Sequence, residues 1–299
     1  MFLRIDAAEN CMLDYKELDT STLPSSNLVR ETECPGCLGN TLSVVQGREF
    51  LSRCHRCGLI FDNPRPTPEV VLAYYNQADQ YDSWLKDLDR RRRLWVRRIR
   101  KMRAHRNPGS LLDIGTGIGQ FLSLASSEYS SVTGTEISSR AIEIASQLYG
   151  LEILNGTIES LALSRQFDNI TAFHVLEHVH WPCRFLERCG QLLRKGGKLF
   201  LAVPNELEML GAKTRKHALA PVTLLSPEIH LSHWTSQSLI SLLGSHGFET
   251  LHVSLDPFWV ASRSRGCFQW VRFLSMSVMH SLTAINVYPT MWVVAQKPE

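Results

Sequence analysis

The sequence predicts an α/β protein built on a doubly wound, mostly parallel sheet, with a small cysteine-bearing unit in front of it. From residue 110 onward, short apolar runs alternate with segments of helical periodicity, which indicates parallel strands covered by helices on both faces. A glycine-rich turn spanning residues 115 to 119 directly follows the first of these apolar runs. Two Cys-x-x-Cys pairs lie between residues 34 and 57, ahead of the alternating pattern.

Size and composition allow one main domain with smaller appendages. A chain of 299 residues with 44% apolar residues can bury one full α/β core, and a net charge of +3 is too small to indicate nucleic-acid binding by itself. Arg4, Asp6 and Glu9 interrupt the first ten residues, so these lack the apolar region of a signal peptide. No apolar run is long enough for a membrane span, and we expect a cytoplasmic protein with reduced or metal-bound cysteines.

The part of the chain before the sheet divides into three predicted segments. Residues 1–33 are polar and irregular, and we expect a flexible N-terminal segment. Residues 34–61 form a compact unit, closed by a proline-rich run at 63–68 that excludes a continuous helix. Residues 62–108 are expected to be a helical linker with two or three N-terminal helices, because apolar residues recur there at helical intervals.

The two cysteine pairs predict a structural metal site. Cys34 and Cys37 form the first pair, and Cys54 and Cys57 form the second, with 16 residues between the pairs. This spacing is typical of a four-thiolate zinc ribbon, and four thiolates leave no open position on the ion, so we expect structural Zn²⁺. Redox or unliganded thiols are the alternative. The other cysteines lack partners at ligand spacing and are expected to be plain buried or incidental thiols: Cys11, Cys183, Cys189 and Cys267.

Residues 109–299 are expected to form the main domain. Its predicted strands lie at 110–114, 131–135, 151–154, 168–173 and 198–203. Its predicted helices lie at 119–127, 138–149 and 183–194. A helix near 236–244, a strand near 248–255 and a final antiparallel strand near 287–296 complete the pattern, with lid or insert segments at 206–235 and 257–285.

The glycine loop and a later acid predict a nucleotide-type cofactor. Three glycines let the backbone turn sharply and approach a ligand closely, but Gln120 stands where a dinucleotide fingerprint needs its third glycine. Asp113 at the mouth of the loop would repel a pyrophosphate and suits a cofactor with an ammonium or sulfonium group. Glu136, at the end of the second strand, suits a ribose diol. Together these residues favour S-adenosylmethionine; the alternative is a plain tight turn followed by a solvent-facing acid.

Four ordered segments carry a resemblance to a known family. They are Leu-Leu-Asp-Ile-Gly-Thr-Gly at 111–117, Thr-Glu-Ile-Ser at 135–138, residues 167–179, and residues 193–205. In this order and spacing they resemble the motifs of class I S-adenosylmethionine-dependent methyltransferases over about residues 70–299, which implies a Rossmann-like fold. The cysteine pairs and the run after Cys57 are similar to a bacterial subgroup with an N-terminal zinc ribbon. That subgroup is usually associated with sugars, polysaccharide precursors and other small metabolites.

The resemblance implies roles for individual residues. It assigns the methionine portion of the cofactor to the backbone around Gly115, Thr116 and Gly117, with Asp113 anchoring nearby polar groups, and the ribose hydroxyls to Glu136. Contacts to the adenine and to the remaining cofactor edge are expected from Ile137, Ile158, Glu159 and His174. The chain departs from the family pattern at Thr157, where an acid usually binds the adenine amino group, so Glu159 or backbone groups are expected to replace it.

Methyl transfer needs a base only if the acceptor must lose a proton. We expect His230 to be the acceptor-side base, with His174 as the second candidate, because a histidine can take a hydroxyl proton near neutral pH. Each could instead be a hydrogen-bonded structural histidine. Glu177 and His178 have two interpretations of equal standing, a local turn and a substrate role.

The sequence leaves two classes of methyl acceptor open, RNA and small molecules or glycan precursors. Ten Arg or Lys residues between 90 and 106, together with the zinc ribbon, make RNA methylation the alternative. An amphipathic helix with a solvated charged face explains the basic residues more simply. C-terminal aromatic residues favour a small-molecule or glycan-precursor acceptor, if they roof a pocket and are not ordinary core: Trp234, Phe258, Trp259, Phe268 and Trp270. A non-catalytic methyltransferase-like scaffold is the second alternative. The sequence sets neither the acceptor atom nor the oligomeric state.

Overall fold

The computed structural model describes residues 23–45, 48–77, 81–205, 229–256, 274, 278 and 290–299. Its first described element is a short 3-10 helix (Ser25–Asn27), followed by β1 (Leu28–Val29), which pairs antiparallel with β5 (Arg65–Pro66). The buried guanidinium of Arg65 binds Glu31 at 2.7 Å. The end of the segment expected to be flexible, residues 23–33, is therefore attached to the body of the protein.

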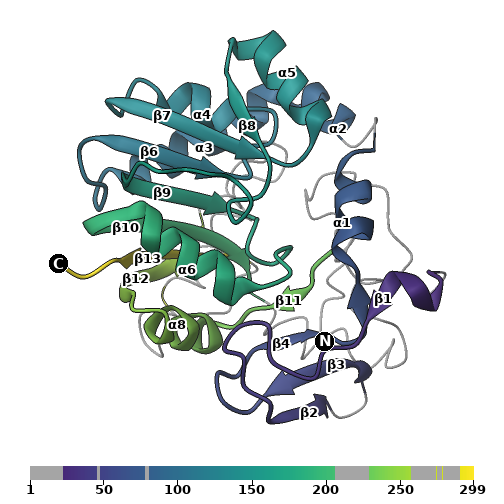
Figure 1. Cartoon of the computed structure of the whole chain (residues 1–299). Coiled ribbons are helices and arrows are strands. Elements are labelled where there is room, and N and C mark those ends of the chain that lie inside the picture. Colours follow the sequence, from purple (N-terminus) through teal and green to yellow (C-terminus); the bar gives the residue numbers. More distant parts are fainter. Residues whose placement is uncertain are drawn as a thin grey trace, which may run out of the picture.

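The cysteine-bearing unit is an antiparallel sheet that includes a strand from far along the chain. β2 (Leu42–Val45), β3 (Arg48–Cys54) and β4 (Ile60–Asp62) form a meander, and β11 (Ser232–His233) pairs antiparallel with β4. The strand order is β11-β4-β3-β2. Figure 1 shows this sheet below the main sheet, with β11 between the two. We refer to this unit from Cys34 to the end of β4, which contains all four cysteines and β2, β3 and β4, as the ribbon.

Three helices connect the ribbon to the main sheet, in agreement with the helical periodicity of this segment. They are α1 (Pro68–Tyr75), α2 (Asp82–Lys86) and α3 (Leu88–Met102). α1 begins at a proline, whose fixed φ suits the first helical position and whose missing N–H is not needed there.

The main sheet has seven strands in the order β12-β13-β10-β9-β6-β7-β8. They are β6 (Ser110–Ile114), β7 (Ser131–Glu136), β8 (Ile153–Asn155), β9 (Phe167–Phe173), β10 (Leu193–Pro204), β12 (Glu249–Leu255) and β13 (Thr290–Gln296). The pairs on the β10 to β8 side are parallel, whereas β13 is antiparallel to both of its neighbours. The predicted doubly wound, mostly parallel sheet with an antiparallel final strand is confirmed.

Four further helices cover the strands: α4 (Gln120–Ala125), α5 (Ser139–Tyr149), α6 (Pro182–Leu192) and α8 (Ser236–Ser245). The boundaries of α5 follow from its residues, because the Ser138 side chain accepts a hydrogen bond from the Ala141 amide and Gly150 ends the helix at φ +64°. α8 begins with a capping box made by Thr235 and Ser238.

Each face of the main sheet has its own core, as strand alternation requires. Leu199 and Leu201 of β10 belong to one cluster with α6, whereas Phe200 and Ala202 belong to the other with α3 and α4. The first cluster also contains α8 and the ribbon residues Cys34, Cys54, Cys57, Leu59 and Phe61. The ribbon therefore shares a hydrophobic core with the main sheet. Within the described residues, no helix is both long and apolar enough to cross a membrane.

Candidate active site and metal centre

The glycine loop follows β6 at the carboxyl edge of the sheet. Gly115, Gly117 and Gly119 have φ values of +67°, +56° and +78°, a left-handed conformation that side chains other than glycine rarely adopt. A Cβ atom at Gly115 would lie 2.5 Å from Val175, and one at Gly117 would lie 2.8 Å from Trp84. The loop is therefore closely packed on two sides, and its glycines are required by both backbone conformation and space.

Glu136, the last residue of β7, connects the two predicted cofactor motifs. Its Oε2 accepts a hydrogen bond from the Gly117 amide at 2.8 Å, and its Oε1 accepts from Ile137 at 2.8 Å and Ser138 at 3.0 Å. Burial raises the pKa of this carboxyl, although the three amide hydrogen bonds oppose the shift. The structure thus brings Gly115, Thr116, Gly117, Glu136 and Ile137 together where β6 and β7 end.

Asp113 holds the glycine loop against the neighbouring strand β9. Its carboxyl accepts hydrogen bonds from the hydroxyls of Thr116 and Thr171, both at 2.6 Å, and the residue is only 3% exposed. Burial raises the pKa of Asp113 to about 7, against the opposing effect of the two hydroxyls. Asp113 therefore positions the loop. Of the residues expected at the adenine, Ile158 is buried in the core and Glu159 is exposed.

An aromatic group from the N-terminal helices covers the glycine loop. Trp84 of α2 lies against Gly117, and the guanidinium of Arg91 stacks on the Trp84 ring at 3.6 Å. Tyr81 meets the same ring edge-on at 5.2 Å. Sequence reasoning missed these residues, since periodicity marked the segment as helical but could not show which sheet edge it covers.

His174, directly after β9, is held in an unusual conformation between two charged groups. Its φ of +57° is uncommon for a residue other than glycine and is often found at functional sites. Arg98 donates a hydrogen bond to His174 Nε2 at 3.0 Å, and because a guanidinium can only donate, the ring proton lies on Nδ1. Nδ1 then donates to Glu177 Oε1 at 3.2 Å. This arrangement fixes the tautomer of His174.

Arg98 is itself held by a buried carboxylate. Its Nε donates to Asp256 Oδ1 at 3.0 Å, a second bond joins Nη2 to Oδ2, and both side chains are fully buried. Asp256, Arg98, His174 and Glu177 thus form one continuous chain of contacts next to the end of β9. Sequence reasoning missed Arg98 and Asp256, because the arginine lay within a run of basic residues and its partner lies 158 positions away.

The buried basic residues of α3 have internal partners, and so do two arginines just after the helix. Arg91 and Arg98 are buried, and Arg103 and Arg106, just after the helix, pair with Glu128. The exposed members are Arg92, Arg93, Arg100 and Arg103. The exposed arginines agree with the expected solvated face of an amphipathic helix, whereas Arg91 and Arg98 are buried and make internal contacts.

Glu177, His178 and His230 form a compact cluster beside His174. One potential ligand atom from each lies within 4.8 Å of the others, and Glu177 and His230 are almost completely buried. Burial tends to raise the pKa of Glu177, but the hydrogen bond from His174 and the charges of nearby histidines outweigh it, so the pKa lies below its ordinary value. The sequence suggested His230 and Glu177 separately, and the structure brings them together.

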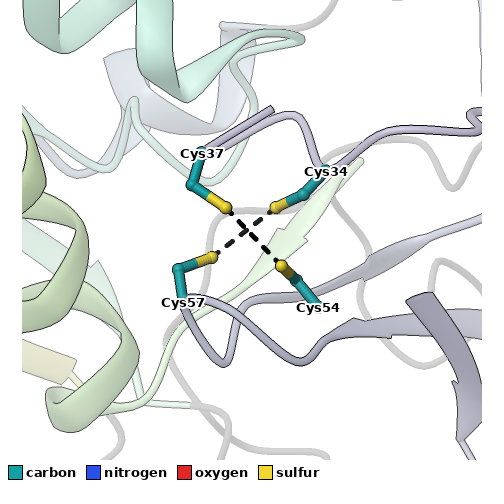
Figure 2. Close-up of side chains that lie close together, drawn as sticks. All are labelled: Cys34, Cys37, Cys54 and Cys57. Carbon is teal, nitrogen blue, oxygen red and sulfur yellow. Dashed lines mark hydrogen bonds between the residues drawn. The ribbon is translucent and has the colours of Figure 1, made fainter. Parts of the chain in front are cut away.

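The four ribbon cysteines converge on one point. Figure 2 shows the sulfur atoms of Cys34, Cys37, Cys54 and Cys57 directed towards one another. Cys34 and Cys57 are 3.6 Å apart at Sγ, and Cys37 and Cys54 are 3.5 Å apart. A tetrahedron with metal–sulfur bonds of about 2.3 Å has edges of about 3.8 Å, so these two distances are compatible with a tetrahedral zinc ion. The Gly36 amide also donates to Cys34 Sγ at 3.4 Å, which supports a thiolate there.

Two other cysteines are buried as expected, and Trp234 has the core setting that was the alternative to a pocket roof. Cys183 and Cys189 are buried thiols of α6, and Trp234 is fully buried in the core shared with the ribbon. The remaining candidates lie outside the described residues: Cys11, Phe258, Trp259, Cys267, Phe268 and Trp270.

The residues that form this edge of the sheet lie within the part of the chain that matches a known protein family. A family model described as a methyltransferase domain matches residues 78–253, which is more than half of the chain. The chain belongs to this methyltransferase family. The match begins after the ribbon, so it covers the glycine loop, Glu136 and the histidine cluster but none of the four cysteines.

Individual relatives of the methyltransferase cover less of it. The ubiquinone biosynthesis O-methyltransferase of Nitrosomonas europaea is 32% identical over 104 residues, which are 32% of this chain and 44% of that protein. The chain thus spans less than half the length of the curated relatives it matches. Among solved structures, a Thermotoga maritima methyltransferase described as a possible histamine N-methyltransferase has a TM-score of 0.53 at 21% identity, covering 75% of this chain and 97% of that one.

A second solved structure contains a cofactor product. Magnesium protoporphyrin IX methyltransferase from Synechocystis, with bound S-adenosylhomocysteine, has a TM-score of 0.52 at 15% identity, covering 77% of this chain and all of that one. At these identities both structures show that the methyltransferase shares their fold.

Proposed function

We propose that the chain transfers a methyl group from S-adenosylmethionine to a small-molecule or sugar/glycan-precursor acceptor, at oxygen, nitrogen or carbon. The observation that carries the proposal is the contact of Glu136 with the Gly117 amide, which joins the glycine loop and the acidic motif into one site. That site lies at the carboxyl ends of parallel strands, where open α/β sheets bind their ligands. Figure 1 shows the arrowheads of β6, β7 and β9 pointing to this edge.

The cofactor side follows from these contacts. Backbone groups of Gly115, Thr116 and Gly117 would hold the methionine portion, and the carboxylate of Glu136 retains acceptor capacity for ribose hydroxyls beyond its three amide bonds. Ile137, next to Glu136, is the proposed adenine contact. The bound cofactor would supply an electrophilic methyl group, and the protein would contribute mainly alignment, worth up to about 7–11 kcal/mol in well-oriented reactions.

The acceptor side is proposed to lie at the histidine cluster. His230 and His174 are the expected proton acceptors, and both belong to the group around Glu177. Arg98 and Glu177 engage the two ring nitrogens of His174, which favours His230 for that role.

The four cysteines are proposed to bind structural Zn²⁺. Their sulfur spacing fits a tetrahedral ion, and a closed thiolate shell leaves no position for substrate. The resemblance of the ribbon to that of a sugar- and metabolite-modifying subgroup supports the proposed acceptor class.

A small acceptor is favoured over RNA by two observations. The curated relatives carry the name ubiquinone biosynthesis O-methyltransferase, and the buried arginines of α3 serve internal contacts. RNA methylation through the exposed arginines and the ribbon is the alternative.

Calorimetric titration with S-adenosylhomocysteine tests the cofactor site. Glu136→Gln removes the carboxylate charge with little change in size, and affinity is expected to fall about ten- to hundredfold, because a hydrogen bond to a charged group contributes about 1.5–3 kcal/mol. The matched control is Glu143→Gln, the same change on the exposed face of α5, which should leave affinity unaltered. Absence of binding by the native chain, or equal affinity of all three proteins, would contradict the proposal.

A further inference from the structure

Glu177, His178 and His230 reach one point from two distant segments. Glu177 and His178 lie in the loop after β9, whereas His230 lies just before β11. Their potential ligand atoms are all within 4.8 Å of one another, and the rings of His178 and His230 meet edge-on with centroids 5.0 Å apart. The cluster is separate from the four cysteines and exists only in the folded chain.

The Glu177 carboxylate has an unsatisfied oxygen. Its Oε1 accepts from His174, but its Oε2 is buried and has no hydrogen-bond partner in the described part of the chain. Leaving a buried acceptor without a donor costs about 1–3 kcal/mol, and more when the group is charged. A bound cation would satisfy this oxygen.

His178 is oriented as a metal ligand would be. Its Nδ1 hydrogen bonds to the Ile229 carbonyl, and because a carbonyl can only accept, Nδ1 carries the proton. In the neutral ring the lone pair is then on Nε2, which lies 3.9 Å from Glu177 Oε1. Metal-binding histidines typically donate their other ring N–H to a carbonyl or carboxylate in this way.

The backbone holds the two segments in register. The Glu177 carbonyl accepts hydrogen bonds from the amides of Leu231, at 2.8 Å, and Ser232, at 3.1 Å. The Leu231 carbonyl in turn accepts from the Asp62 amide at the end of β4. These contacts fix the loop after β9 and the segment containing His230 without using the side chains of the cluster.

We propose that Glu177, His178 and His230 bind one divalent first-row metal ion, distinct from the ion of the four cysteines. Two imidazoles and one carboxylate suit Zn²⁺, Fe²⁺ or Co²⁺, and three protein ligands leave positions open for oxygen atoms of another molecule. A His230 that holds the ion cannot also be the proton acceptor proposed above, so the two roles exclude each other and the zinc measurement below decides between them.

The ion would lie beside the cofactor loop. Val175, two residues before Glu177, touches Gly115 of that loop. The open coordination positions of the ion could therefore hold oxygen atoms of the methyl acceptor. This use of the ion rests on the proposed function, whereas the site itself rests on the geometry of the three side chains.

Equilibrium dialysis of the full chain against Zn²⁺, followed by metal analysis, tests the site. Glu177→Gln and His230→Gln are each expected to hold one zinc per chain fewer than the native protein. The control His246→Gln changes a partly buried histidine of the α8 terminus, outside the cluster, and should hold as much zinc as the native protein. Circular dichroism of both cluster variants checks that they are folded.

The readout separates this site from the other proposals. The cysteine ion contributes equally to all four proteins, so the difference in zinc isolates the second site. Equal zinc content in the native chain and in a folded Glu177→Gln variant would overturn it. Titration of the same samples with S-adenosylhomocysteine reports on the cofactor site independently, so native protein that binds this ligand without the extra zinc would contradict the metal site alone.

Discussion

The Asp113 carboxyl makes the free energy of unfolding depend on pH, and a single substitution removes this contribution. Burial raises its pKa from 3.8 to about 7, so between these pH values the folded chain binds more protons than the unfolded chain. Its contribution to stability is complete below about pH 4 and is lost as pH rises to about 7, by up to about 1.4 kcal/mol per pH unit. Asp113→Asn should flatten the pH dependence of the free energy of unfolding over this range, measured by urea denaturation. Parallel curves for the two proteins would contradict this account.

The buried pair of Arg98 and Asp256 gives a second prediction for single residues. Asp256→Asn leaves a buried guanidinium without its counter-charge, so the free energy of unfolding should fall by about 3–5 kcal/mol. The double variant Arg98→Met with Asp256→Leu should recover part of this loss, because apolar replacement of both partners avoids the desolvated charge. A double-mutant cycle of Arg98→Met, Asp256→Leu and the double variant, measured by urea denaturation, gives the coupling. Additive losses would show that the two side chains act independently.

The helices and strands were predictable because their signals are local. Alternation and helical periodicity placed β6 at its observed residues and α5 within one residue of its observed start. The glycine loop and Glu136 could also be predicted, because each motif lies within a few residues of a strand end. The pairing of β11 with β4 could not, since two residues carry no strand pattern and their partner lies about 170 positions away. The contact of Arg98 with Asp256 and the joining of Glu177 to His230 depend on the same long-range folding.

Substitution of two glycines at element boundaries can distinguish the cost of backbone strain from the cost of steric overlap. Gly119 and Gly150 both have left-handed backbone, but a Cβ atom at Gly119 would lie 2.8 Å from Ala145 and Leu151, whereas nothing lies within 4 Å of one at Gly150. Gly150→Ala should therefore lower the free energy of unfolding by about 1–2 kcal/mol, the cost of the left-handed conformation. Gly119→Ala should lose an additional 1–3 kcal/mol, roughly, from overpacking. If chemical denaturation gave the same loss of unfolding free energy for both variants, the neighbours of Gly119 in the α4–α5 contact would move aside without cost.

At the scale of the whole molecule, the ribbon and the main sheet share one hydrophobic core. Cys54, Leu59 and Phe61 pack in the same cluster as α6 and α8, and β4 pairs with β11 next to His230. Loss of the ion proposed for the ribbon, through Cys54→Ser, should therefore increase amide exchange in β4, β11 and α8, with little effect on α5 at the far edge of the sheet. Hydrogen exchange followed by mass spectrometry measures this pattern. A change confined to the ribbon would show that the two parts are uncoupled.

The central claim concerns the whole protein, since the cofactor edge and the histidine cluster are proposed to act on one acceptor. Incubation of the chain with methyl-labelled S-adenosylmethionine and fractionated cell extract, with and without ribonuclease, tests it most directly. Label should enter a small-molecule or glycan-precursor fraction that resists ribonuclease, and Glu136→Gln should abolish most of this transfer while Glu143→Gln retains it. Label that enters RNA, or a native chain that binds the cofactor and labels no fraction, would contradict the account.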